Sequence, residues 1–132
     1  MVSEEWQIIY YQEVDGTKPV EEFFNDPSLT QGELKQFKLR LYYLKNKGLA
    51  LQRERSDILD KIETEDKLYE LRLDNTRNNI RIFVCALPGK GKRLILLHAF
   101  KKKGDKTPLR QIKIAAKRRD LTIAKEDKTD EQ

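Results

Sequence analysis

Two arginines, a run of lysines and the one histidine are the residues of this chain whose types suit chemistry on a phosphate. Arg72 and Arg81 lie in segments with strand composition, where a soluble protein usually carries apolar or short side chains. Arginine donates two parallel hydrogen bonds to an anion and keeps its charge at every physiological pH. Lys101–Lys103 directly follow the next apolar segment, which contains His98. These residues predict a cationic surface that stabilises charge on a phosphodiester.

Such a surface suits RNA cleavage in particular, because RNA carries its own nucleophile, the 2′-hydroxyl. A protein can cleave RNA by holding that hydroxyl in line and stabilising the charge that develops on the phosphate. A lysine transfers protons only with a lowered pKa, which neighbouring lysines favour, whereas histidine titrates near neutral pH. The candidate catalytic residues are therefore Arg72, Arg81, His98, Lys101 and Lys102.

Each candidate also has a structural interpretation. Arg72 fits an ion pair with an acid on a neighbouring strand. Arg81 needs either a partner or a functional cleft, because a buried unpaired charge is costly. His98 fits a hydrogen-bonded core histidine, and the lysine run fits a solvated loop. From the residues alone, these alternatives stay open.

The chain lacks the catalytic residues of most other enzyme classes. A single histidine excludes a two-histidine nuclease. A Cys–His nucleophile would need Cys85 and His98 to meet from two different predicted strands. No His/Cys cluster has the spacing of metal ligands, so we expect neither a metal nor a cofactor. Cys85 lies in an apolar pattern that predicts a small buried side chain. The basic turn from Pro88 to Lys92 lacks the spacing of a phosphate-binding P-loop.

Charge is distributed unevenly along the 132 residues, a length typical of one domain. Residues 1–30 hold seven acids and one lysine, whereas residues 31–119 hold 24 Lys/Arg and ten Asp/Glu. A basic middle of this kind favours RNA, DNA or an acidic protein as partner, although it also fits a solubilising surface. No apolar run is long enough for a membrane, and the N-terminus lacks a signal-peptide pattern, so we expect a cytoplasmic protein.

Periodicity predicts the elements that must position these residues. Three strands over 68–73, 80–87 and 94–100, joined by short turns, form an antiparallel meander. Before them, the sequence predicts a strand over 6–12, a short helix over 19–25 and a helix over 31–47. The apolar face of that helix comprises Leu34, Phe37, Leu41 and Leu44. Residues 49–65 show no clear period, apart from a candidate short strand at 58–62.

A last helix is predicted over 108–119. The sequence thus predicts a single α+β domain over 1–119 with an antiparallel-rich sheet of four or five strands. We expect the helices, an N-terminal helical hairpin and the C-terminal helix, to pack on one face of this sheet. Residues 120–132 form a charged tail that we expect to be frayed or disordered.

Several segments of the chain together resemble a known family. They read Leu68-Tyr69-Glu70-Leu71-Arg72, then Ile80-Arg81-Ile82-Phe83, then Leu96 to Lys103, with Thr107-Pro108 and Ala115-Ala116 in the last helix. In combination they resemble the RelE/HigB superfamily of bacterial toxins, and most of all its phage-derived, Gp49-like HigB branch. The resemblance covers residues 5–119 and is strongest over 68–116.

The resemblance implies a small RelE-like α+β toxin that cuts mRNA in the ribosomal A site without a metal. It also implies a cognate antitoxin, a helix-turn-helix (HigA-like) protein encoded next door. The toxin–antitoxin complex would then bind its own operator DNA. No membrane is involved in this scheme.

Carried over by position, Arg81 falls where the family has its phosphate-stabilising arginine, and Arg72 where it has a basic side chain. Lys101–Lys103 fall where it has catalytic or phosphate-binding groups. Some members also use a tyrosine or histidine near the start of the final helix, where this chain has Asp105 to Pro108. That departure leaves the proton-transfer groups unassigned. The cations expected to bind RNA are Arg77, Lys103, Lys106, Arg110 and Lys113.

Two other functions are compatible with this fold. ParE-like toxins bind DNA gyrase and cleave nothing, but the placement of Arg81 and Lys101–Lys103 favours the ribonuclease. A phage-derived relic that only binds an antitoxin or nucleic acid would show no toxicity.

Overall fold

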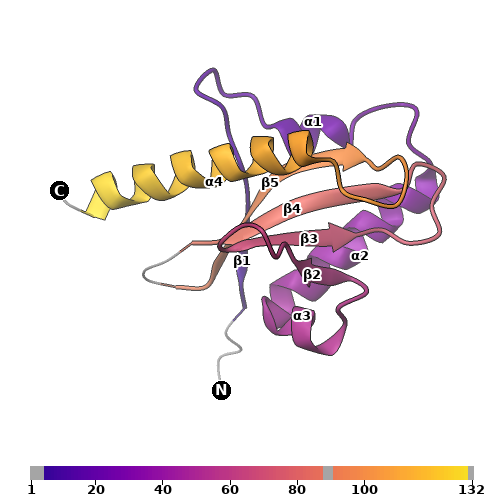
Figure 1. The fold of residues 1–132 in the computed structure, drawn as a ribbon, viewed down its shortest axis with the longest axis horizontal. Coiled ribbons are helices and arrows are strands. Elements are labelled where there is room, and N and C mark those ends of the chain that lie inside the picture. The colour runs from indigo at the N-terminus through magenta and orange to yellow at the C-terminus, as the bar shows by residue number, and fades with distance from the viewer. Residues whose placement is uncertain (1–4, 88–90, 131–132) are drawn as a thin grey trace.

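The structure is a computed structural model that describes residues 5–87 and 91–130, and its elements form an α+β fold (Figure 1). The strands are β1 (Gln7–Tyr10), β2 (Leu59–Lys61), β3 (Leu68–Arg72), β4 (Ile80–Ala86) and β5 (Arg93–Lys101). The helices are α1 (Pro19–Phe23), α2 (Gln31–Lys47), α3 (Ala50–Glu54) and α4 (Leu109–Asp130). Residues 88–90 of the predicted basic turn lie outside the described residues.

The described strands form one five-stranded mixed sheet in the order β1-β5-β4-β3-β2. The predicted antiparallel meander of β3, β4 and β5 is confirmed, and Arg72 lies directly opposite Arg81. The short strand at 58–62 is present as β2, antiparallel to β3. β1 runs parallel to β5 and forms one edge of the sheet.

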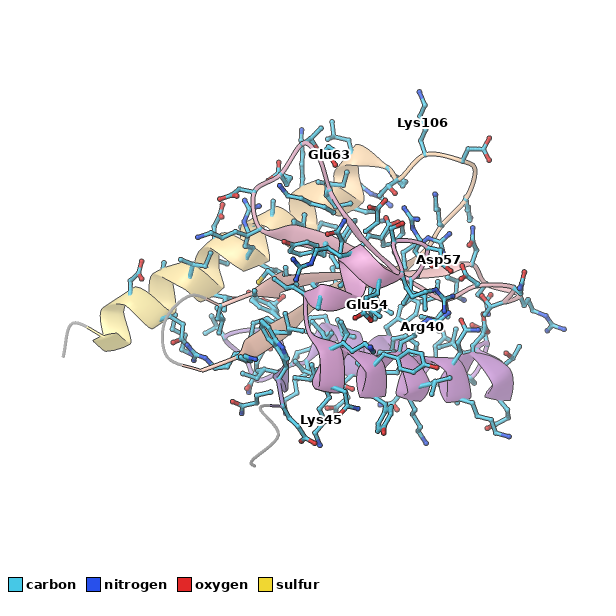
Figure 2. The ribbon with its side chains drawn as sticks, turned by 90° about the horizontal axis from the view of Figure 1, so that it is seen from below. Arg40, Lys45, Glu54, Asp57, Glu63 and Lys106 are labelled. Atoms are coloured by element: carbon cyan, nitrogen blue, oxygen red, sulfur yellow. The ribbon has the colours of Figure 1, made fainter. Side chains whose placement is uncertain are left out.

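The helices lie on both faces of the sheet, which corrects the expectation of a single covered face. One face, here called the α2 face, buries Ile82 and Val84 of β4 together with Phe37 and Leu44 of α2. The other, here called the α4 face, buries Phe83 with Ile112 and Ala115 of α4. Figure 2 shows α2 and α4 on opposite sides of the strands. Because β4 is apolar on both faces, it needs cover from both.

The N-terminus of α2 is tied to the turn that joins β3 and β4. Thr30 and Glu33 form a capping box, in which each side chain bonds the other residue's backbone N–H. The buried carboxylate of Glu33 also accepts from the backbone N–H of Asn78 at 2.8 Å and from its side chain at 2.7 Å. The turn between Arg72 and Arg81 is therefore fixed to α2.

α4 is longer than predicted. It continues to Asp130, past the expected end at residue 119. Ile123 packs against the core of the α4 face, and Glu126 lies 3.1 Å from Arg93 of β5. These contacts hold part of the predicted frayed tail in the helix. Among the described helices, none has the length and apolar character needed to cross a membrane.

β5 carries a bulge that decides where His98 lies. Phe83 pairs with His98, but the next residue, Val84, pairs with Leu96, so Leu97 is the extra residue. Leu97 packs in the core of the α4 face, and strict alternation would then place His98 on the α2 face. The bulge returns His98 to the α4 face.

Candidate anion-binding site

Arg72 and Arg81 lie side by side on the α4 face. They are cross-strand partners on β3 and β4, and Phe100 of β5 is the next residue in the same row. Like charges placed directly opposite each other repel, so this pair requires a counter-anion. The row lies at the end of the sheet where β5 leads into the loop before α4.

The counter-anion is Glu70, whose side chain is only 1% exposed. Its Oε1 lies 3.0 Å from Nε of Arg72 and 3.6 Å from Nε of Arg81. Its Oε2 accepts a 2.8 Å hydrogen bond from the hydroxyl of Thr107, just before α4. A buried carboxylate is stable only with such partners. One carboxylate thus joins both arginines to the start of the last helix.

Arg72 is the better compensated of the two arginines. Besides Glu70, its Nη2 donates to Oδ2 of Asp60 on β2 at 3.1 Å. Burial alone lowers the pKa of Arg72, but the two carboxylates raise it above its ordinary value. From the α2 face, Nε of Arg40 donates to the backbone carbonyl of Arg72 at 3.0 Å and fixes the end of β3 (Figure 2). These contacts therefore agree with the interpretation of Arg72 as one partner of an ion pair with an acid on a neighbouring strand.

Arg81 is less completely satisfied. Its Nη1 donates to the carbonyls of Leu73 at 3.3 Å and Ile80 at 3.1 Å. Its Nε is buried and forms no hydrogen bond, although Glu70 lies nearby. Within the described residues, Nη2 has no partner either. Burial is the main reason that the pKa of Arg81 lies below its ordinary value, and Arg72 adds to this effect. Arg81 is thus the guanidinium that has hydrogen-bond donors left for an anion.

Lys101 does not join this pair. It lies opposite Ile80, whose side chain is buried on the α2 face. Its Nζ donates to Oγ of Ser28 at 2.8 Å and lies 3.8 Å from the carboxylate of Asp26. Lys102 continues the strand pairing, because its backbone N–H donates to the carbonyl of Asn79 at 2.9 Å. The structure therefore places Lys101 on the face of the sheet opposite the two arginines.

His98 lies on the same face as Arg81 but is held between two side chains of α4. Its Nδ1 lies 3.2 Å from Nη1 of Arg118, and its Nε2 contacts Oε1 of Gln111. A guanidinium can only donate, so Nδ1 accepts and Nε2 carries the proton. Burial lowers the pKa of His98, and Arg118 and Arg110 lower it further, against the contact with Gln111. These contacts fit a neutral, structural histidine.

This arrangement predicts a pH dependence of stability. The folded-state pKa of His98 lies below its ordinary value of 6.5, so the unfolded chain binds the proton more tightly. The free energy of unfolding should then fall as the pH drops below the ordinary value, by at most about 1.4 kcal/mol per pH unit. Urea unfolding between pH 5.5 and 7 measures this slope. A His98→Gln variant should lose it, and an unchanged slope in that variant would contradict the assignment.

The predicted RNA-binding cations lie mostly around the start of α4. Lys103, Lys106, Arg110 and Lys113 are exposed, and none of them has an ion-pair partner among the described residues. Figure 2 shows Lys106 extending from the loop before α4. Arg77 is exposed on the turn between β3 and β4. The start of α4, around which four of these cations lie, is joined to the site by the hydrogen bond from Thr107 to Glu70.

Other candidate chemistry is sparse in the described part of the chain. No group of three or more His, Cys, Asp or Glu side chains there is arranged to hold a metal ion. Cys85 is buried on β4, as predicted, and burial raises its pKa to about 12. Its thiol is therefore protonated at neutral pH.

Sequence reasoning missed Glu70, Asp60 and Thr107. Glu70 and Arg72 are two residues apart on one strand, so they share a face, and this spacing was a usable signal. Asp60 and Thr107 come from distant segments, and only the fold brings them to the site.

A comparison with models of protein families shows the family of this chain. The model described as "Phage derived protein Gp49-like (DUF891)" matches residues 28–120, from α2 into α4. A search of curated proteins finds no match. The matched region contains Arg72, Glu70, Arg81 and Thr107, which form the candidate site. The chain belongs to the Gp49-like family of phage-derived proteins, which is the HigB/RelE-like toxin branch.

Proposed function

We propose that this chain is the toxin of a bacterial type II toxin–antitoxin system, a RelE-like domain that cleaves mRNA on the ribosome. The observation that carries the proposal is the incompletely satisfied guanidinium of Arg81, whose Nη2 has no partner in the described residues. It lies on β4, between two neighbouring strands, and Thr107 joins its ion-pair partner Glu70 to the start of α4, where exposed cations gather. Membership of a toxin family supports the same reading.

In this mechanism the protein stabilises charge and the RNA supplies the nucleophile. The 2′-hydroxyl attacks the adjacent phosphorus and loses its proton, and the bond to the 5′-oxygen breaks as that oxygen gains a proton. The products are a 2′,3′-cyclic phosphate and a 5′-hydroxyl end. Arg81 donates hydrogen bonds to the phosphate oxygens as their charge increases. Arg72 contributes positive charge beside it, within its ion pairs to Glu70 and Asp60.

Primer extension on a reporter mRNA in a translating extract tests this function, with and without ribosomes. New 5′ ends that appear within codons only when ribosomes are present would support it. Intact mRNA together with growth arrest and a DNA-damage response would instead support a ParE-like gyrase inhibitor. A chain that arrests nothing would be a relic, and the proposal would fail.

The exposed cations near α4 should dock the RNA backbone of the ribosome. The triple change Lys106→Gln, Arg110→Gln and Lys113→Gln should raise KM and lower the salt dependence of ribosome binding. Each lost phosphate contact reduces the slope of log K against log [salt] by about one unit. Cosedimentation with ribosomes at several KCl concentrations measures this slope.

A matched control removes the same charge from the opposite side of the molecule. Lys35→Gln and Lys38→Gln on α2, with Arg53→Gln on α3, change three exposed cations. The control should keep the wild-type slope. Equal losses in both triple variants would indicate a net-charge effect and refute a specific docking surface.

By the same resemblance, a helix-turn-helix antitoxin binds this toxin, and the complex binds operator DNA. The toxin then acts in the cytoplasm, where translating ribosomes are present. These partners are part of the proposal.

A further inference from the structure

Glu70 lies at the centre of the site, but the proposed cleavage mechanism gives it no step. It lies on β3, two residues before Arg72, and is opposite Phe83 of β4. Both arginine Nε atoms approach the same oxygen, Oε1, at 3.0 and 3.6 Å. Thr107 donates to the other oxygen, Oε2, at 2.8 Å. The carboxylate is therefore shared between the two arginines and the segment that begins α4.

The position of Glu70 excludes direct contact with substrate. The side chain is 1% exposed, and both oxygens face protein groups. A general base must lie within hydrogen-bond reach of the proton that it removes. Glu70 does not meet this condition for a 2′-hydroxyl bound outside Arg81.

The shared carboxylate has a definite effect on Arg81. Its Nε side faces Glu70, and its Nη1 is held by the carbonyls of Leu73 and Ile80. With these two sides fixed, Nη2 is the remaining side of the planar guanidinium. The charge of Glu70 also offsets the repulsion between Arg81 and Arg72.

We propose that Glu70 is the positioning residue of the phosphate site, which holds Arg81 with Nη2 directed at the substrate and couples it to α4 through Thr107. This inference rests on the proposed function for its kinetic consequence. Its structural part, the fixed orientation of the guanidinium, does not depend on any activity.

The test is Glu70→Gln, which keeps the shape of the side chain: its one oxygen can still accept from the arginines, and its NH2 group can donate to the hydroxyl of Thr107. The variant loses the negative charge that orients Arg81. Because a misplaced catalytic group costs as much as about 100-fold in rate, kcat should fall between about 10-fold and 100-fold. KM should stay the same or decrease, because the site becomes more positive for RNA. Glu70→Asp, which restores the charge, should recover part of the lost kcat.

A matched control removes a carboxylate from another ion pair. Glu65→Gln breaks the 3.0 Å contact with Arg119, outside the site. This variant should keep both kinetic constants. If Glu70→Gln does not fold, Thr107→Val gives the same test, because it removes the hydrogen bond to Oε2 and should lower kcat with KM unchanged. A folded Glu70→Gln protein with the wild-type kcat would overturn the proposal.

A second measurement separates this inference from the proposed function. Arginine Nε–Hε resonances in NMR report rotation of each guanidinium. Arg81 should rotate slowly in the wild type and faster in Glu70→Gln. If the wild type cleaves no RNA but shows this difference, the nuclease proposal fails and the positioning role stands. If rotation of Arg81 is the same in both proteins, the positioning role is wrong.

Discussion

Replacing Arg81 by lysine should reduce ribosome-dependent mRNA cleavage by roughly 10²–10³-fold, the usual cost of losing one preorganised donor to a developing oxyanion. Lysine keeps the positive charge but has a single nitrogen at its end. It cannot bond the carbonyls of Leu73 and Ile80, as Nη1 of Arg81 does, and also present a second nitrogen to a phosphate. The loss should therefore appear in kcat.

The same substitution elsewhere provides the comparison. Arg72→Lys should cost less than Arg81→Lys, because Arg72 is held by two carboxylates and has less free donor capacity. Arg55→Lys, in an exposed pair with Asp57, should cleave at the wild-type rate. Primer extension measures all three variants, with thermal unfolding as the check on folding. Normal cleavage by a folded Arg81→Lys protein would remove Arg81 from the mechanism.

The elements that form from local signals were predictable from the sequence. The meander has short polar turns and strand-forming residues, and α2 has apolar residues at helical spacing, of which Phe37 and Leu44 are buried. The parallel pairing of β1 with β5 was not predictable. It joins distant segments, and the residues of a strand do not indicate whether its partner runs parallel or antiparallel to it. The covering of both faces of the sheet could have been predicted from β4, because its residues are apolar on both sides.

In the candidate site, too, features that depend on neighbouring residues were predictable, and features that depend on distant segments were not. Arg72 and Arg81 could be paired from the meander alone, because a short turn fixes the register. Lys101 lies on the face opposite Arg81 in the structure, but strict alternation from the start of β5 would have placed the two residues on the same face, because it omits the bulge. The place of His98 depends on a bulge, for which the sequence carries no recognisable mark. The contact of Glu70 with Thr107 could not be predicted, because Thr107 belongs to a distant segment that only the fold brings to β3.

Gly48→Ala should destabilise the fold by about 2–6 kcal/mol, as the sum of backbone strain and overpacking. Gly48 ends α2 with φ of 57° and ψ of −139°, in the left-handed half of conformational space that favours glycine. A Cβ at this position would lie 2.0 Å from Cε2 and Nε1 of the Trp6 indole. Real atoms do not approach so closely, so the indole or the helix end must move.

Movement of the indole is restricted. The backbone N–H of Trp6 donates to the carbonyl of Lys45 at 2.8 Å, and Nζ of Lys92 lies 5.8 Å from the ring centroid. Trp6 also packs against the core of the α2 face, next to β1. The added methyl group therefore disturbs the contact between α2 and the edge strand.

Urea unfolding followed by circular dichroism measures the loss, and two comparisons identify its cause. Gly104→Ala changes a glycine with φ of 83° and open space around its Cβ, so it reports backbone strain alone. In a Trp6→Ala background, the cost of Gly48→Ala should fall towards that of Gly104→Ala, because the clash is gone. A cost that is the same with and without the indole would show that the close approach of Trp6 is not the reason for glycine at this position.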